Sequence, residues 1–197
     1  MIDLHTHTLH SDGTLIPSEL ARRAEEAGYK AIGITDHVDA SNAKEVVLRT
    51  VKVCQALAGY VRVKLVPGAE ITHVPPPQIA ELAERIREWG GKLVVLHGET
   101  IAEPVAKGTN VSGLESDIDI LAHPGLISEE EAKLAAERGI YLELTRRDGH
   151  SITNGHVARV ANECGAPLVL NTDAHRPEDL FSSESWLEWW ISLYSTM

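Results

Sequence analysis

Histidine and carboxylate side chains recur in this sequence where short apolar runs end. The polar residues that end these runs are His5 and His7, Asp36 with His37, Glu70, His97, His123, Thr145 with Arg146, and Asp173 with His175. From His7 onward, successive positions lie 22 to 33 residues apart, about the length of one strand and one helix. If brought together, the imidazoles and carboxylates would form a metal centre. A ligand mixture without thiolate suits Zn²⁺, Mn²⁺ or Fe²⁺.

The apolar runs predict the scaffold that positions these residues. Seven β-branched runs are typical of strands: 2–5, 31–35, 61–66, 92–96, 118–122, 141–144 and 168–171. Segments of helical period lie between them: 17–27, 43–58, 77–89, 128–138 and 153–164. This alternation predicts parallel β/α units, and we expect a single-domain α/β fold, a distorted seven-stranded (β/α)7 TIM-like barrel. The alternative is an open doubly wound sheet, which the absence of a GxGxxG loop after the first run disfavours.

In a parallel barrel, residues just past each strand converge on the carboxyl-terminal mouth. His5 and His7 are two residues apart in an extended segment, so both side chains face the same way and can reach one ion. Six imidazoles and two or three carboxylates crowded at this mouth would repel one another if charged. Divalent metal resolves that crowding, and the pattern therefore predicts a metal centre.

Composition limits the partners of this 197-residue chain. Its 18 Lys and Arg against 29 Asp and Glu give a formal net charge of −11. We therefore expect no stable nucleic-acid partner and no membrane association. Two distant cysteines, no signal-peptide pattern and no run of about 18 apolar residues predict a soluble, cytoplasmic protein.

The end of the chain differs in composition from the rest. Three of the four tryptophans, Trp186, Trp189 and Trp190, fall within residues 181–197. We expect a barrel domain over residues 1–180 and a Trp-rich helical tail over 181–197 packed on it. A homo-oligomer contact through this tail is the alternative, because clustered aromatic side chains are costly to leave in water.

Six motifs resemble the PHP (polymerase and histidinol phosphatase) family. They are Asp3-Leu4-His5-Thr6-His7 with Ser11-Asp12-Gly13, Ile34-Thr35-Asp36-His37, Gly68-Ala69-Glu70, His97-Gly98-Glu99-Thr100, Ala122-His123-Pro124 and Asn171-Thr172-Asp173-Ala174-His175. The resemblance implies a distorted seven-stranded barrel that holds up to three divalent ions for phosphoester hydrolysis. It implies three ligand sets: His5, His7, Glu70 and Asp173; His97 and His123 with Glu70 bridging; and Asp12, His37 and His175.

The same resemblance suggests a mechanism. Metal ions supply the positive charge that a phosphate ester needs in an acidic protein. We hypothesise that a metal-bridging hydroxide attacks phosphorus in line, in a trinuclear centre whose catalytic carboxylates are Glu70 and Asp173. His150, in the loop after the sixth run, is the candidate proton donor to the leaving group.

Substrate contacts are predicted after the sixth run as well. Arg146 and Arg147 are candidates for a bidentate phosphate clamp, with help from Lys107 and Asn110. The alternative for the arginine pair is a solvated surface. His10, His73 and His156 receive no role in the ligand sets; His73 is expected to pack or to form hydrogen bonds.

Several functions fit these residues. We favour a phosphatase that acts on a small phosphomonoester, such as histidinol phosphate or a nucleotide, because no further module is evident in the sequence. A 3′–5′ exonuclease or phosphodiesterase is the first alternative, weakened by the lack of a basic surface. A non-catalytic metal-binding regulatory module is the second. An amidohydrolase is more distant, since Glu70 as a bridging group and the order of the later motifs argue against it.

Overall fold

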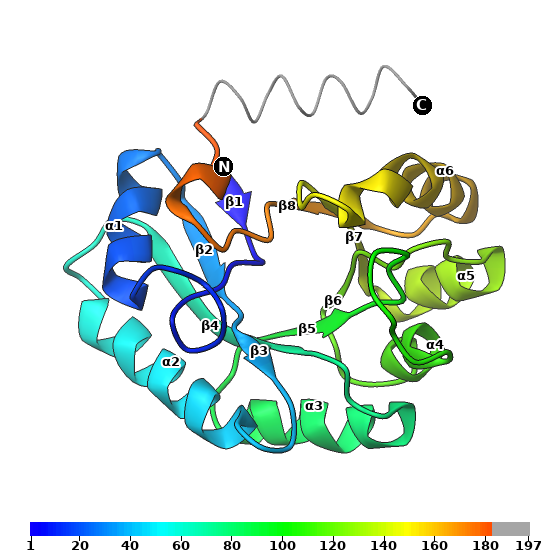
Figure 1. Ribbon diagram of the computed structural model, residues 1–197, viewed down its shortest axis with the longest axis horizontal. Coiled ribbons are helices and arrows are strands. Elements are labelled where there is room, and N and C mark those ends of the chain that lie inside the picture. Colours follow the sequence, from blue (N-terminus) through cyan, green and yellow to red (C-terminus); the bar gives the residue numbers. More distant parts are fainter. Residues whose placement is uncertain (183–197) are drawn as a thin grey trace.

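A computed structural model describes residues 1–182 and gives them a parallel β/α architecture (Figure 1). The strands are β1 (Ile2–Asp3), β2 (Ala31–Ile34), β3 (His37–Val38), β4 (Lys64–Ile71), β5 (Leu93–His97), β6 (Ile120–Ala122), β7 (Tyr141–Thr145) and β8 (Leu168–Asn171). The α-helices are α1 (Pro17–Glu26), α2 (Ala43–Leu57), α3 (Ile79–Glu88), α4 (Thr109–Leu114), α5 (Glu129–Arg138) and α6 (Asn154–Cys164). Short 3-10 turns span Pro76–Gln78, His150–Thr153 and Pro177–Asp179.

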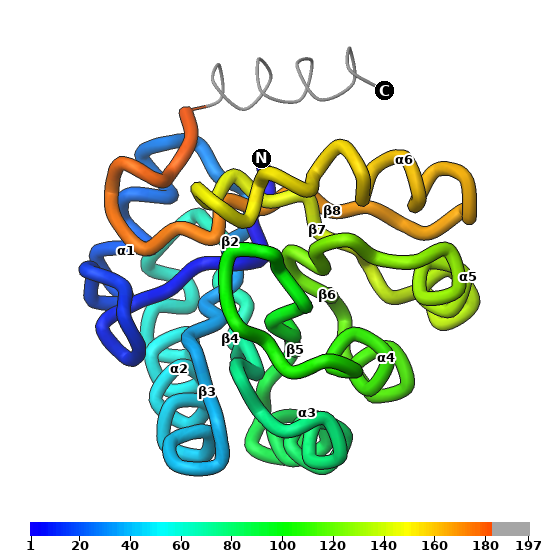
Figure 2. The backbone as a smooth tube through the Cα atoms, turned by 45° about the vertical axis from the view of Figure 1, so that its right-hand side comes forward, coloured from blue at the N-terminus to red at the C-terminus, as the bar shows by residue number. Residues whose placement is uncertain are grey.

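Seven strands form one parallel sheet in the order β1-β2-β4-β5-β6-β7-β8, and the short β3 also pairs with β4. The ends of this sheet approach each other, because Thr6 and Ala174 form a parallel bridge just past β1 and β8. The His7 amide donates to the Ala174 carbonyl at 2.9 Å. The sheet is therefore a nearly closed barrel surrounded by helices (Figure 2), and the predicted seven-stranded fold is confirmed.

Three elements differ from the expectation, and the first is the two-residue β3, which was not predicted. β4 runs to Ile71, five residues beyond the predicted end of that strand. Pro67 is tolerated inside β4 because pairing with β5 begins one residue later, at Gly68, so no ladder bond on that side needs a Pro67 amide hydrogen. Helix α4 was not predicted, because its six residues include Gly113 and four residues of low helix propensity, Thr109 to Ser112, and are too few to show a 3.6-residue period.

Aliphatic side chains pack inside the barrel toward the amino ends of the strands and between the strands and the surrounding helices. Inside the barrel, Leu93, Val95, Ile120 and Ala122 form one buried cluster. A larger cluster joins the outer strand faces to α2, α3, α5 and α6. Apolar packing therefore holds the strands from both sides and leaves their carboxyl ends for polar residues.

Helix termini agree with the sequence signals. Pro17 occupies the first turn of α1, and Ser128 and Glu131 form the predicted capping box of α5. No helix among residues 1–182 is both long enough and apolar enough to cross a membrane. The tryptophans of the predicted tail lie outside the described residues, so the tail and its boundary stay predictions.

Candidate metal centre

The nine predicted ligands all lie at the carboxyl ends of the strands. His5 and His7 follow β1, His37 begins β3, Glu70 lies near the end of β4 and His97 ends β5. The other four lie in loops at the same end: Asp12 before α1, His123 after β6, and Asp173 and His175 after β8. The barrel thus brings together residues that are up to 170 positions apart, from His5 to His175.

The buried Glu70 carboxylate lies among four imidazoles. Its Oε1 is 3.4 Å from His5 Nε2 and 3.5 Å from His123 Nε2. Its Oε2 is 2.6 Å from His37 Nδ1 and 3.7 Å from His7 Nε2. The two oxygens therefore face different imidazoles, and Glu70 could offer donor atoms to divalent cations in two directions.

Asp173 faces three of the same imidazoles, those of His5, His7 and His123. Its Oδ1 is 3.0 Å from His7 Nε2 and 3.7 Å from His5 Nε2, and its Oδ2 is 3.8 Å from His123 Nε2. Asp173 and His123 have positive φ angles of 54° and 29°, in a region where non-glycine residues are uncommon. Strained backbone held at the inner ends of two loops is typical of functional sites.

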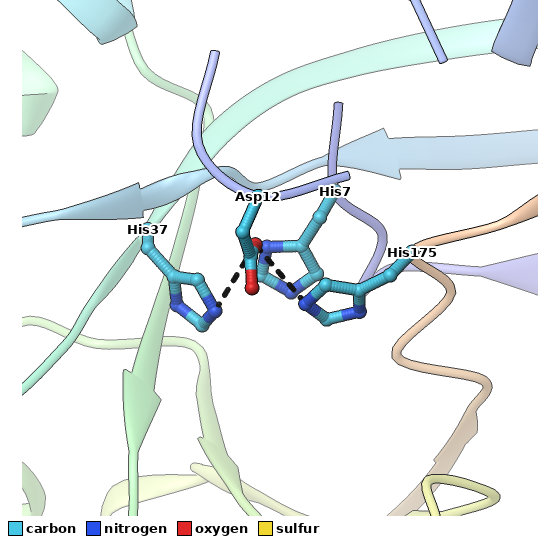
Figure 3. A group of neighbouring side chains, drawn as sticks. All are labelled: His7, Asp12, His37 and His175. Carbon is cyan, nitrogen blue, oxygen red and sulfur yellow. Dashed lines mark ion pairs between the residues drawn. The ribbon is translucent and has the colours of Figure 1, made fainter. Parts of the chain in front are cut away.

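A third group lies toward solvent, where Asp12 faces His37 and His175 (Figure 3). Asp12 Oδ1 is 3.2 Å from His175 Nε2 and 3.6 Å from His37 Nε2. The His7 ring stacks on the His175 ring with centroids 4.1 Å apart. The Asp12 loop can approach β1 because residue 13 is glycine: a Cβ there would be 2.4 Å from the His7 carbonyl oxygen.

Several of these ligand atoms are buried and have no hydrogen-bond partner in the described structure. They are His5 Nε2, His7 Nδ1 and Nε2, Glu70 Oε1, His123 Nδ1 and Asp173 Oδ1. Leaving a buried polar atom unpaired costs about 1–3 kcal/mol, so such a concentration needs an explanation. Nitrogen and oxygen donors aimed at one another in a closed space fit divalent cations. The residues present therefore fit the metal ions that the pattern implies.

The protonation states also suit cations. Burial alone would raise the pKa of Glu70, but His37 and His5 outweigh it and hold that pKa well below its ordinary value. Burial lowers the pKa of His97 to about 4, with His123 adding to the effect. Burial would also lower the pKa of His5, but Glu143, Glu70 and Asp173 raise it well above its ordinary value. Glu70 and His97 are thus in their metal-binding forms at neutral pH, whereas His5 would release a proton on binding.

Glu143 is a site residue that the sequence reasoning missed. Its Oε1 accepts from His5 Nδ1 at 2.8 Å and from the Asn171 side-chain amide at 2.8 Å, while Oε2 accepts the His123 amide hydrogen at 3.1 Å. A carboxylate on Nδ1 fixes the His5 tautomer and directs Nε2 into the site. The available signal was a charged residue in the middle of the apolar run Tyr141–Thr145.

Asp36 also acts indirectly. It accepts hydrogen bonds from the Thr8 amide at 2.7 Å and from the Thr8 and Ser11 hydroxyls at 2.8 Å each. These bonds hold the loop after β1, which carries Asp12. Asp36 therefore positions the third ligand group rather than facing it.

A further carboxylate that the sequence analysis did not single out, Glu103, lies at the rim of the site. Its oxygens are 3.2 Å from His97 Nε2, 3.3 Å from His73 Nε2 and 3.4 Å from His150 Nε2. The buried His150 stacks on His123 with centroids 4.3 Å apart, and its Nδ1 is 2.7 Å from the Thr100 hydroxyl. Burial and His123 lower the pKa of His150 to about 4.

The predicted substrate residues are not equally placed. Arg147 lines the cavity of about 290 Å³ that is also lined by the candidate ligands His37, His97, His123 and His175, whereas Arg146 and Lys107 do not line it. Arg146 donates to the backbone carbonyls of residues 178 and 179 and lies over the Phe181 ring. The Asn110 side chain bonds the Glu99 amide and the Pro124 carbonyl. His156 bonds the Ile127 carbonyl, away from the site.

A nearly closed parallel barrel with an imidazole and carboxylate cluster at its carboxyl end defines a metal-dependent hydrolase. The PHP domain matches residues 3–105. An uncharacterized protein of Methanocaldococcus jannaschii is 47% identical over 184 residues, which cover 92% of this chain and 84% of that protein. The chain belongs to the PHP domain family, whose members are metal-dependent phosphoesterases, and the predicted family and enzyme class are confirmed.

Solved structures share the fold. A chain of an archaeal ribonuclease P with mature tRNA superimposes with a TM-score of 0.71 at 18% identity, covering 98% of this chain and 82% of that one. Histidinol phosphate phosphatase from Lactococcus lactis, complexed with zinc, L-histidinol and phosphate, gives 0.68 at 15% identity, covering 99% and 93%. At these identities the likeness concerns the fold alone.

Proposed function

We propose that this protein is a phosphatase that hydrolyses a small phosphomonoester with three divalent cations bound at the carboxyl end of the barrel. The observation that carries this proposal is the set of buried, unpaired nitrogen and oxygen atoms of His5, His7, Glu70, His123 and Asp173. His123 and Asp173 line the small cavity at the carboxyl end, and the other three residues lie next to them, so bound cations would satisfy these atoms together.

The proposed ligand sets are those that the resemblance to the PHP family implies. One ion would be held by His5, His7, Glu70 and Asp173; a second by His97, His123 and Glu70; and a third by Asp12, His37 and His175. The ligand atoms of several such groups lie within 4.8 Å of one another, including His5, His7 and Glu70, and Asp12 with His7, His37 and His175. Zn²⁺, Mn²⁺ and Fe²⁺ all accept this mixture of nitrogen and oxygen donors.

When bound, such ions activate water and neutralise charge on the phosphate. The chain's own residues do the positioning. Glu70 and Asp173 both face the imidazoles of His5 and His7, and Glu143 holds His5 through Nδ1. Arg147 at the cavity wall would bind non-reacting phosphate oxygens in bidentate fashion.

His150 is the proposed partner of the leaving-group oxygen. When the Thr100 hydroxyl donates to Nδ1, Nε2 carries the proton and points to the rim, 3.4 Å from Glu103. In this role, replacing His150 with Gln should slow esters with poor leaving groups more than aryl esters with good ones. Equal slowing of both ester types would contradict it.

Size and charge favour a small monoester over a nucleic-acid strand. The cavity is about 290 Å³, and the chain has a net charge of −11. The test is a panel of phosphomonoesters, including histidinol phosphate and nucleotides, alongside a labelled single-stranded oligonucleotide, each with metal-loaded protein. Release of inorganic phosphate from a monoester is the expected result. Shortening of the oligonucleotide without monoester turnover would instead indicate a nuclease.

A non-catalytic role in a ribonucleoprotein is the remaining alternative, since the fold is also that of a ribonuclease P chain. In that case the metal-loaded protein would hydrolyse none of these substrates. The near-complete burial of Glu70, His5, His7 and His123 supports the catalytic proposal, because a purely structural role gives no reason to keep such a costly cluster.

A further inference from the structure

A second cavity, of about 370 Å³, adjoins the candidate metal centre. Its lining residues are Arg146, Arg147, Asp148, Thr172, Arg176 and Asp179. Arg147 lines this cavity and also the cavity of the metal centre. Thr172 directly precedes the candidate ligand Asp173. The two cavities therefore share a wall, and one molecule could extend from the metal centre into the second cavity.

This second cavity, the arginine cavity, is basic although the protein is acidic. Three of the chain's 18 basic residues line it, against two carboxylates. One of these carboxylates is already engaged, because Asp179 Oδ2 accepts the amide hydrogens of His175 and Arg176 at 2.9 Å each. Its distance to Arg147 Nη1 is 4.0 Å, the limit of an ion pair. The guanidinium groups are thus only partly neutralised.

The Arg146 guanidinium is held in place by the chain, and Arg147 is anchored at its backbone. Arg146 Nη1 donates to the Asp179 carbonyl at 3.1 Å, and its guanidinium lies 4.6 Å from the centroid of the Phe181 ring. Arg147 directly follows it, and its amide hydrogen bonds the Thr145 hydroxyl at the end of β7. A fixed guanidinium loses little entropy on binding an anion, and its planar donors match the oxygens of phosphate and carboxylate.

We infer that the arginine cavity binds a second anionic group of the substrate. This inference deepens the proposed function and rests on it: the ester phosphate lies at the metal centre, and a further phosphate or carboxylate of the same molecule lies among Arg146, Arg147 and Arg176. The preferred substrates are therefore phosphate esters that carry a second anion. Arg147, shared by the two cavities, contacts the groups at both ends.

Binding of non-hydrolysable analogues tests this inference without turnover. Manganese-loaded protein is titrated calorimetrically with three-carbon phosphonates whose other end is a hydroxyl, a carboxylate or a second phosphonate. The carboxylate and bisphosphonate compounds should bind about tenfold more tightly than the hydroxyl compound, as expected for added charge-assisted hydrogen bonds. Their relative affinities distinguish a carboxylate from a phosphate as the second group.

Variants locate the effect. Arg176→Gln should reduce the preference for the second anion while leaving the affinity of the hydroxyl compound unchanged, because Arg176 lines only the arginine cavity. Arg147→Gln should weaken all three compounds and abolish the preference. The matched control is Arg138→Gln, since that guanidinium bonds the carbonyls of Glu115 and Ser116 on α5's side of the molecule. Metal content is measured for each variant.

The outcomes separate this inference from the proposed function. Equal affinity for the three compounds, or a preference that survives both Arg176→Gln and Arg147→Gln, would overturn the inference even if simple phosphomonoesters are hydrolysed. Conversely, a fully metal-loaded protein that hydrolyses no phosphate ester would overturn the proposed function. The affinity ratios would still decide whether the arginine cavity binds an anion.

Discussion

The two ends of the barrel carry opposite chemistry on the same strands. At the amino end, a cavity of about 880 Å³ is lined mainly by aliphatic side chains, among them Leu4, Leu93 and Ile120. At the carboxyl end, buried imidazoles and carboxylates leave several polar atoms unpaired. β5 shows both, since it begins at Leu93 and ends at His97. Packing at one end therefore stabilises a polar cluster at the other, and substitutions at the two ends should have separable effects.

The largest expected effect is at the bridging carboxylate. Glu70→Gln removes the charge that faces His5, His7, His37 and His123. We expect kcat/KM for a phosphomonoester to fall about 1,000-fold, with loss of bound metal measured by mass spectrometry. The matched control is Glu84→Gln on the exposed side of α3. A variant that keeps full metal content and more than a tenth of the activity would show that Glu70 does not bridge.

A smaller loss of metal affinity is expected for a residue that contacts a candidate ligand without facing the ions itself. Glu143→Gln keeps the shape of the side chain that orients His5 but removes its charge. Metal affinity should fall about 10- to 100-fold, because outer carboxylates fix the tautomer and the basicity of a metal-binding imidazole. Titration of metal-free protein with Mn²⁺ measures this change. Unaltered affinity would mean that His5 does not depend on Glu143.

Substitution in the solvent-facing ligand group of Asp12, His37 and His175 should have a smaller effect still. Asp12 is 56% exposed, whereas Glu70 is fully buried. Asp12→Asn should lower the affinity of one of three ions about tenfold and leave the other two bound. Metal stoichiometry at graded metal concentrations distinguishes the sites. Loss of all three ions together would show that Asp12 is part of a single cooperative centre.

A substitution at the amino end of the barrel should lower the stability of the fold and leave the activity nearly unchanged. Ile120→Ala enlarges the amino-end cavity and removes apolar contacts in the buried cluster with Leu93 and Val95. The free energy of unfolding should fall by about 2–5 kcal/mol. Measured well below its unfolding temperature, this variant should keep the parent metal stoichiometry and nearly the parent kcat/KM. Loss of bound metal from a variant that is still fully folded would show that packing at the amino end affects metal binding at the carboxyl end.

Much of this arrangement follows from local sequence. Strand and helix periodicity predicts seven β/α units, and parallel strands bring residues such as His5 and His175 to one mouth. The extension of β4 past Pro67 could not be read locally, because it depends on where pairing with β5 begins. Glu143 was missed for a related reason: its role appears only when β7 lies opposite His5. Arg146 likewise contacts a segment more than 30 residues away.

The central claim is that the buried cluster at the carboxyl end binds catalytic divalent ions. The most direct measurement combines metal analysis with phosphomonoesterase activity, before and after chelation followed by gel filtration. The account predicts up to three ions per chain, loss of activity on their removal, and recovery on addition of Mn²⁺ or Zn²⁺. Phosphatase activity that persists in protein shown to be metal-free would contradict it.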